Sequence, residues 1–282
     1  MRINTNVSSL TAQESTSQTN KSISSSLEKL SSRLRINKAA DDASGLAIAD
    51  RLRTQASSIN QGISNGNSAV ALLQIADKSM AEQSNILDTV KAKLIQANTA
   101  TTSADGRESI RKDITKLLEQ LDNIAQQTNY NGSYLLQLDA TSGAASTASL
   151  SFQVGEKTTD TITMTGVRSN TAGLALTSLT GLAVSGLTTA VAQSGQTAVD
   201  SAITTLNGYR GDIGSTQNQI ESAVRNLSTQ ATNIKNAESV IRDVDYAQES
   251  ANFNKLNIIS QAGSYAISQA NAVQQNVLRL LQ

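Results

Sequence analysis

Asp41 and Asp42 come closest, by residue type and spacing, to the paired carboxylates of acid–base catalysis. Adjacent side chains diverge on a regular element, so helix capping or a contact between chains is favoured over catalysis. The chain has His 0 and Cys 0, which excludes Ser-His-Asp and Cys-His catalysis and the usual zinc ligand sets. The composition alone does not exclude catalysis by carboxylates or by lysine. We expect a protein that is not an enzyme, with no catalytic, cofactor-binding or metal-binding residue.

The charge balance gives no electrostatic reason to expect binding to nucleic acid or to an anionic membrane surface. Lys+Arg 23 equals Asp+Glu 23. No apolar run has the length that a membrane span needs. The opening Met1–Asn6 lacks the apolar region of a secretory signal, so export would need a route that does not read such a peptide.

Two stretches near the chain ends place apolar residues at alternating steps of three and four, the a/d pattern of a coiled-coil seam. Pro 0 leaves long helices uninterrupted. The first stretch is crowded with Ser and Thr, so its helix needs a partner. We expect that stretch to pair with Val273, Val277 and Leu280. The expected seam consists of Ile23, Leu27, Leu30 and Leu34 near the start and of Leu256, Ile259, Val273, Val277 and Leu280 near the end.

A polar break follows the first stretch, and it has two interpretations. It is either a simple interhelical loop, which the spacing favours, or a hinge or contact loop between two structural levels. Asp41 or Asp42 is expected to cap the next helix, and Gly45 permits tight packing. The residues of this contact loop are Arg35, Ile36, Asn37, Asp41, Asp42 and Gly45.

Helical periodicity then extends from about Leu46 to Asn98. Gly62 and Gly66 allow two alternatives within this range, a continuous helix or a helix interrupted near the two glycines. After a turn, Asp105 and Glu108 resemble a capping box for another helix.

The segment that follows is rich in Thr, Ser, Gly and Ala, and it contains alternating runs. Ser149–Val154 and Thr159–Met164 flank a short turn and predict a β-hairpin. Helical periodicity returns near Thr197. The nested order predicts a mainly α fold, an elongated antiparallel helical bundle or coiled coil formed by N- and C-terminal segments, with a small insertion that contains the hairpin.

Six short motifs at the two ends, over about residues 1–140 and 197–282, resemble those of the bacterial flagellins. Each motif is weak alone, but their order along a chain without cysteine is specific. They are Met1–Asn6, Leu34–Asn37 with Ala40–Ala49, Gln127–Gly132, Arg210–Asn218, Asp243–Ala247 and Gln275–Leu278.

The resemblance implies a structural subunit that polymerises into a hollow, helical flagellar filament for swimming motility. It implies an inner coiled-coil domain (1–42 with 243–282, disordered in the monomer), a helical rod domain (43–139 with 191–242) and an outer β-rich segment (140–190). It also implies a homopolymer, type III export to the extracellular filament, a secretion chaperone at the C-terminal helices, and filament cap and junction proteins as partners.

Two features of the resemblance concern the surface. Where some flagellins carry an Arg-Val-Arg-Glu-Leu pattern read by a Toll-like receptor, this chain has Thr89, Ala92 and Lys93 at the anchor positions, so we expect weak recognition, as in the epsilon group of proteobacteria. Outer hydroxyls also invite glycosylation, with a plain hydrated surface as the alternative. The candidates are Thr141, Ser146, Thr147, Ser178 and Thr180.

Two other classes of protein remain as alternatives. A hook–filament junction protein shares the helical ends, but its match to residues 35–46 should be poorer. A cytoplasmic coiled-coil scaffold explains the seams but neither the paired end motifs nor the hairpin.

Overall fold

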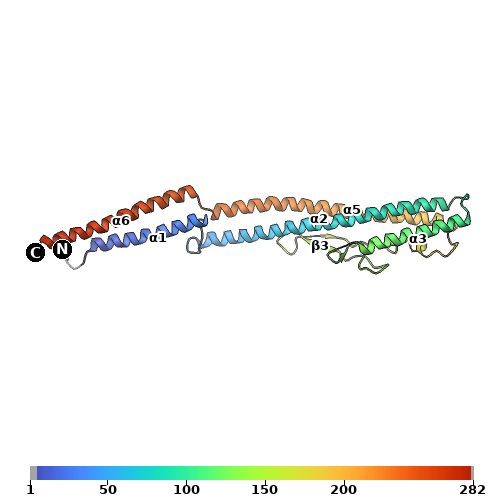
Figure 1. Cartoon of the computed structure of the whole chain (residues 1–282), viewed down its shortest axis with the longest axis horizontal. Helices are drawn as coiled ribbons and strands as arrows, with labels where there is room; N and C mark the ends of the chain where they lie inside the picture. Colours follow the sequence, from blue (N-terminus) through green and yellow to red (C-terminus); the bar gives the residue numbers. More distant parts are fainter. Residues whose placement is uncertain (1–4, 281–282) are drawn as a thin grey trace. The chain divides into compact units, whose positions relative to one another are not determined.

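The computed structural model describes the backbone of residues 5–280 and the side chains of residues 5–276. Over this range the chain is mainly helical, with two short antiparallel hairpins after the third helix (Figure 1). The expected mainly α fold with a hairpin-containing insertion is confirmed. The helices are α1 (Val7–Ser32), α2 (Ala43–Ala97), α3 (Ala104–Gln127), α4 (Thr177–Thr180), α5 (Thr189–Arg242) and α6 (Tyr246–Leu280), and the strands are β1 (Asn129–Tyr130), β2 (Ser133–Tyr134), β3 (Leu150–Gln153) and β4 (Thr161–Met164).

Contacts divide the chain into two units. One, the end unit, runs up to Ala56 and resumes at Thr232. The other, the middle unit, extends from Ser57 to Ala231.

In the end unit, α1 and α6 lie side by side and antiparallel (Figure 1). Asn6 Nδ2 donates to Ala270 O at 3.1 Å, and Ser260 Oγ donates to Asn20 Oδ1 at 3.1 Å. Nearer the other end of the pair, the Ser26 hydroxyl donates to the Glu249 carboxylate. These contacts fix the register along the two helices.

That register corrects the expected pairing. Residues 23–34 lie opposite residues near 243–256, because Ser26 meets Glu249 and Leu34 forms a backbone bridge with Asp243. Antiparallel packing brings the start of α1, not its end, to the last turns of α6. The pairing of Ile23–Leu34 with Val273 is therefore wrong, and the side chains of Val277 and Leu280 lie outside the described residues.

The α1 helix has defined ends but a weak interior. The Asn6 side chain accepts from Ser9 N at 3.1 Å, and the helix ends at Ser32, before the C-cap residue Arg33, where φ is 63°. Inside it, Thr16 and Thr19 hydroxyls donate to carbonyls four residues back, a bond that slightly destabilises helices. The stability of α1 must therefore come from packing.

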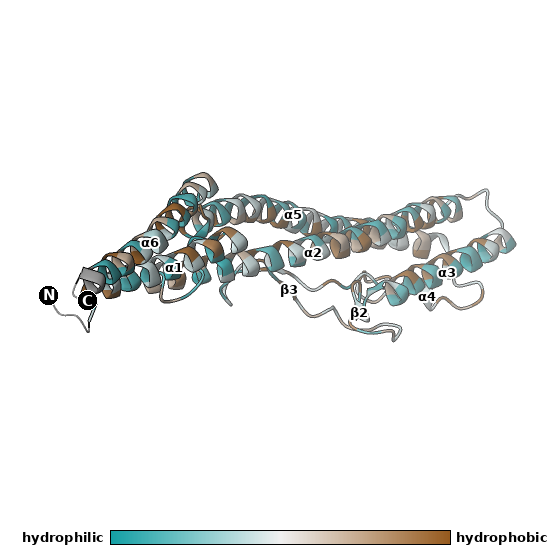
Figure 2. Cartoon of the chain, turned by 60° about the vertical axis from the view of Figure 1, so that its left-hand side comes forward, coloured by the Kyte–Doolittle hydropathy of each residue, from teal (hydrophilic) through white to brown (hydrophobic). Residues whose placement is uncertain are grey.

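The core of the middle unit forms between α2, α3 and α5. Its apolar residues recur at steps of three and four, as amphipathic helices require, and Figure 2 shows them along all three helices. Its large buried side chains include Leu73, Met80, Leu87 and Leu94 from α2, Ile114, Leu118 and Leu121 from α3, and Leu206, Ile213 and Ile220 from α5.

The α2 helix passes without interruption through Gly62 and Gly66. A Cβ on Gly62 would lie 2.4 Å from Val154 O, and one on Gly66 would lie 2.6 Å from Val224 Cγ2. Both glycines therefore allow close approach of another segment, and neither ends the helix.

The expected capping box at the start of α3 is wrong. Ser103 is the N-cap, and its Oγ accepts from Gly106 N at 3.1 Å. Asp105 lies in the first turn, where a carboxylate suits the helix dipole.

Both hairpins follow from local sequence. Asn131 and Gly132 form the two-residue turn between β1 and β2 with φ values of 50° and 83°, which Asn-Gly favours. In the second hairpin Leu150 pairs with Met164 and Gln153 pairs with Thr161, so the predicted hairpin is confirmed.

Polar contacts hold the segment after β4, called the returning segment below, against the helices. Gln83 Nε2 donates to Leu121 O at 3.1 Å and to Ser169 O at 3.2 Å. Asp122 accepts from the backbone N–H and the hydroxyl of Thr171 at 2.7 and 2.8 Å. These bonds tie α2, α3 and the segment after β4 together.

Candidate assembly interface

The contact between α1 and α6 is a narrow seam in which small and polar side chains are mixed with a few large apolar ones. A Cβ on Gly263 would lie 2.6 Å from Thr16 Oγ1, so the two helices approach closely there. Ser26 is the one fully buried side chain of the described part of α1. The least exposed positions along the seam are Ser9, Ala12, Thr16, Thr19, Ile23, Ser26 and Leu30 on α1, and Phe253, Leu256, Ser260, Gly263, Ile267, Ala270 and Gln274 on α6.

The structure places the expected seam residues in two groups. Half-buried positions are Ile23, Leu30, Leu34 and Leu256. Exposed positions are Leu27, Ile259 and Val273, with exposed fractions of 54%, 43% and 53%. The seam instead includes the polar residues Ser26, Ser260 and Gln274. A pattern of apolar residues cannot identify polar residues as seam positions.

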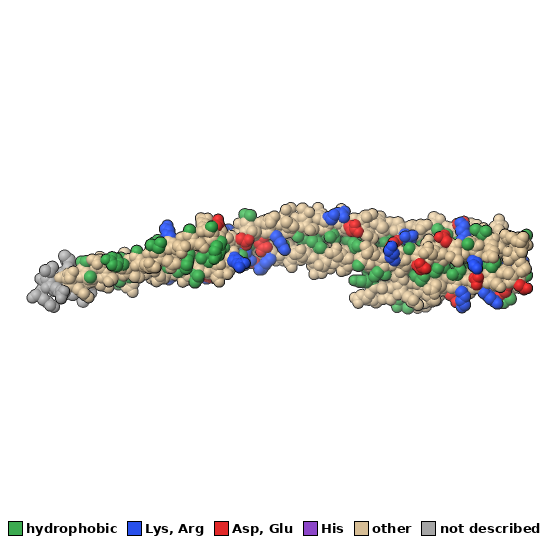
Figure 3. All heavy atoms as spheres, turned by 45° about the horizontal axis from the view of Figure 1, so that its top comes forward, with side chains coloured by type: hydrophobic (Ala, Val, Ile, Leu, Met, Phe, Trp, Pro, Cys, Tyr) green, Lys and Arg blue, Asp and Glu red, His purple; other side chains and the backbone are tan. Residues whose placement is uncertain are grey.

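A second apolar face of α6 points away from α1. Ile258 and Tyr265, seven residues apart, are 66% and 73% exposed, and Ile259 and Val273 lie beside them. No Asp, Glu, Lys or Arg occurs between Leu256 and Asn276. Figure 3 shows hydrophobic side chains on the surface of the α1–α6 pair with few charges among them. An exposed, uncharged stripe at heptad spacing is typical of a helix that packs against further helices.

The contact loop is well structured, and its two carboxylates have different partners. Asp41 Oδ2 accepts from the backbone N–H groups of Lys38 and Asn37, both at 3.0 Å, and these bonds lower the pKa of Asp41. Asp42 Oδ1 accepts from Gly45 N at 2.8 Å at the start of α2. The carboxylates therefore fix a turn and begin a helix, as their adjacency predicts.

The remaining loop residues fasten the ends of helices to each other. Arg35 N donates to Arg242 O at 2.7 Å, and its guanidinium donates to Ile241 O. Ile36 is buried against Gly45, where a Cβ would lie 2.7 Å from Ile36 Cδ1. The structure thus brings all six predicted loop residues into one compact connection.

The stretch at Thr89–Lys93 is part of α2 in the middle unit. Thr89 and Ala92 are exposed, whereas Lys93 forms an ion pair with Asp113 of α3 at 2.9 Å. Lys91 pairs with Asp200 of α5. Both lysines are therefore engaged with neighbouring helices.

The outer hydroxyls differ in accessibility. Thr141, Ser146 and Ser178 are exposed, and Thr180 is half-buried. Thr147 is buried, and its Oγ1 accepts from Val167 N at 2.8 Å. A sugar on Thr147 would require that contact to open.

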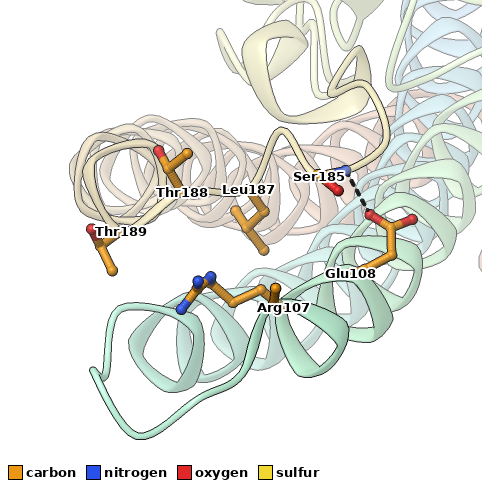
Figure 4. Close-up of a pocket in the computed structure, with 7 residues that line it drawn as sticks. Arg107, Glu108, Ser185, Leu187, Thr188 and Thr189 are labelled. Carbon is orange, nitrogen blue, oxygen red and sulfur yellow. Dashed lines mark hydrogen bonds between the residues drawn. The ribbon is translucent and has the colours of Figure 1, made fainter.

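Sequence reasoning missed the role of Glu108, which lines a pocket of about 170 Å³ at the start of α3 (Figure 4). Its carboxylate accepts from the Arg111 guanidinium at 2.8 and 2.9 Å and from Ser185 N at 3.0 Å. These bonds lower the pKa of Glu108 to about 2. The carboxylate fastens a loop, and the i,i+3 spacing of Glu108 and Arg111 was the available signal.

Within the described residues, no helix combines the length and hydropathy needed to cross a membrane.

Comparison with known proteins agrees with this arrangement. The bacterial flagellin N-terminal helical region matches residues 3–141, and the bacterial flagellin C-terminal helical region matches residues 196–281. The chain is 35% identical to a flagellin of Bacillus subtilis and 34% identical to the flagellar filament 33 kDa core protein of Treponema phagedenis, each over 100% of both chains. A putative flagellar hook-associated protein of Vibrio parahaemolyticus shares the fold, with a TM-score of 0.59 at 13% identity over 72% of this chain and 99% of that one. The chain therefore belongs to the bacterial flagellin family and is a structural subunit of the flagellar filament.

Proposed function

We propose that the apolar face of α6 forms the contacts between copies in the inner part of the filament. The observation that carries this proposal is the uncharged stripe with exposed Ile258, Tyr265 and Val273. A narrow α1–α6 seam leaves this stripe uncovered in one chain, and burial of apolar side chains between copies favours association. Residues 1–42 with 243–282 then form the inner domain, residues 43–139 with 191–242 the helical rod domain, and residues 140–190 the outer segment.

Seeded polymerisation tests the interface. Purified chain, precipitating salt and short filament seeds are combined, and electron microscopy measures filament length. Ile258→Asp and Val273→Asp should leave soluble monomer that does not elongate seeds, because each copy would bury an unpaired carboxylate. Thr158→Asp, which adds the same charge at an exposed position in the connection between β3 and β4, is the matched control and should elongate normally.

The growth of the two α6 variants decides whether this stripe forms the contact between copies. Normal growth by the two α6 variants would contradict the proposed interface.

The same stripe supports a chaperone partner before export. An exposed apolar helix would associate too early inside the cell, so a secretion chaperone that covers α6 fits its chemistry. The same proposal includes type III export to the extracellular filament. It also includes filament cap and junction proteins as further partners.

Two surface properties complete the proposal. Weak recognition by the Toll-like receptor for flagellin follows from Thr89, Ala92 and Lys93, as in the epsilon group, and full potency in a receptor-reporter assay would contradict it. Glycans are proposed on Thr141, Ser146 and Ser178, which are exposed, and less readily on Thr180 and Thr147. An intact mass of native filaments equal to that of the bare chain would exclude them.

A further inference from the structure

Three Asn-Gly pairs occur in the chain: Asn65-Gly66, Asn131-Gly132 and Asn207-Gly208. In such a pair the backbone nitrogen of glycine can attack the Asn side-chain amide, because glycine has no side chain to obstruct the approach. The reaction also needs a backbone that can bring this nitrogen to the Asn Cγ atom. The three pairs have the same local chemistry in different structural settings, so the fold decides which of them reacts.

The pairs within helices are held away from the reactive geometry. Gly66 lies inside α2 and Gly208 inside α5, where the backbone N–H is donated to the carbonyl four residues back. The Asn65 side chain is also held, since Nδ2 donates to Gln153 O at 3.1 Å and Oδ1 accepts from Gln61 Nε2 at 2.9 Å. Attack at either pair would first require local unfolding of a long helix.

The Asn131 pair has none of these restraints. Both residues are exposed, and no heavy atom apart from those of Gly132 and its two chain neighbours lies within 4 Å of a Cβ built on Gly132. Within the described part of the chain, the Asn131 side chain has no hydrogen-bond partner. The turn closes a hairpin of only two residue pairs, which opens at low cost.

We propose that Asn131 is a site of spontaneous deamidation in the folded protein. The Gly132 nitrogen loses its proton to hydroxide and bonds to Asn131 Cγ. The Cγ–Nδ2 bond breaks, and the departing nitrogen takes a proton from water, which regenerates hydroxide, and leaves as ammonia. Water then opens the resulting five-membered succinimide at either carbonyl. The products are aspartate or isoaspartate, and the net reaction consumes one water and releases one ammonia.

The modification changes both charge and backbone at this turn. Either product adds a carboxylate to an uncharged stretch, since no charged residue occurs between Asn123 and Leu138. Isoaspartate also lengthens the main chain by one carbon between the paired residues Tyr130 and Ser133, so their register cannot be kept. Unlike the proposed assembly interface, this site lies in the middle unit, and its chemistry does not depend on polymerisation.

Peptide mapping by mass spectrometry tests the proposal. The full chain is incubated at mildly alkaline pH in oxygen-labelled water, and conversion at all three asparagines is followed with time. Asn131 should convert at least about tenfold faster than Asn65 or Asn207, because the helical sites must first open. Each product should carry one solvent oxygen, and the aspartate and isoaspartate peptides should separate on chromatography.

The urea-denatured chain is the control. There the three rates should converge, because the helices and the hairpin are absent. Equal rates at the three sites in the folded chain, faster conversion at a helical site, or no conversion at Asn131 while the denatured chain reacts would each overturn the proposal.

Discussion

Asp122 fastens the returning segment of the middle unit through a pair of hydrogen bonds to Thr171, at 2.7 and 2.8 Å. Thr171 is buried, so it cannot exchange this partner for water. Asp122→Ala should lower the free energy of unfolding by about 2 kcal/mol, because hydrogen bonds to a charged acceptor are lost and a buried donor is left unpaired. Urea unfolding of the monomer, followed by circular dichroism, measures this change.

The matched control for that variant is Asp88→Ala, which removes an exposed carboxylate from α2. It should change the free energy of unfolding by no more than about 0.5 kcal/mol. Equal effects of the two substitutions would contradict the role given to Asp122.

Glu108 predicts an acid dependence of stability. Its pKa falls from 4.5 to about 2 on folding, first through the Arg111 hydrogen bonds and then through Ser185 N–H. The unfolded chain therefore binds more protons between these two values. The stabilisation from Glu108 should be complete above pH 4.5 and should disappear as the pH falls through about 2.

Urea unfolding at a series of pH values checks this prediction with Glu108→Gln. The difference in unfolding free energy between wild type and variant should shrink as the pH falls through that window. Gln120→Ala, a substitution without a titratable group on the same helix, should shift stability by a constant amount. If the difference in unfolding free energy between wild type and Glu108→Gln stays constant with pH, the role given to Glu108 is contradicted.

At the scale of elements, Gly62 and Gly208 predict opposite effects of the same substitution. A Cβ at Gly62 would lie 2.4 Å from Val154 O, where the hairpin meets α2, whereas no atom beyond the chain neighbours and the adjacent helix backbone lies within 4 Å of one at Gly208. Gly62→Ala should destabilise the chain by about 1–3 kcal/mol through this overlap. Gly208→Ala should stabilise it by up to about 1 kcal/mol, because alanine favours helix. Thermal unfolding measures both, and a higher melting temperature for both variants would disprove the hairpin contact.

Sequence periodicity predicted most helices and strands, because the formation of each depends on residues that are close together in the sequence. The β3–β4 hairpin has a local signal of alternating residues on both sides of a short turn, and it was located correctly. The α1–α6 register was missed because Ser26 and Ser260 occupy seam positions while Ile259 does not. A pattern of apolar residues cannot distinguish a face that packs within one chain from a face exposed for another copy.

Long-range polar contacts were the least predictable part of the structure. Asp122 and Thr171 are separated by 49 residues, and Glu108 and Ser185 by 77. Nothing in the local sequence of either partner indicates the other. The contact loop could be predicted because Asp41 and Asp42 bind backbone groups within four residues.

For the whole molecule, the two units should differ in resistance to protease. The described part of the end unit buries few large apolar side chains besides Ile36, whereas the middle unit contains nearly the whole apolar core. In the monomer we expect α1 and α6 to be cleaved first, leaving a fragment that extends from the start of α2 to the end of α5, close to residues 43–242. Mass spectrometry of timed digests identifies the fragments.

Assembled filaments provide the comparison for these digests. Both helices should become resistant there, because packing between copies would supply the burial that one chain lacks. Resistance of residues 5–40 in the monomer, comparable to that of α3, would contradict this prediction.

The hydrogen bond from Asn6 to Ala270 joins residues 264 positions apart in the sequence. Contacts of such high contact order form slowly, because closing a long loop costs entropy before the contact can offset it. During synthesis from the N-terminus, α1 therefore has no partner until almost the entire chain has been made. Pairing of the two ends must be one of the last events in folding, and this delay is set by topology alone.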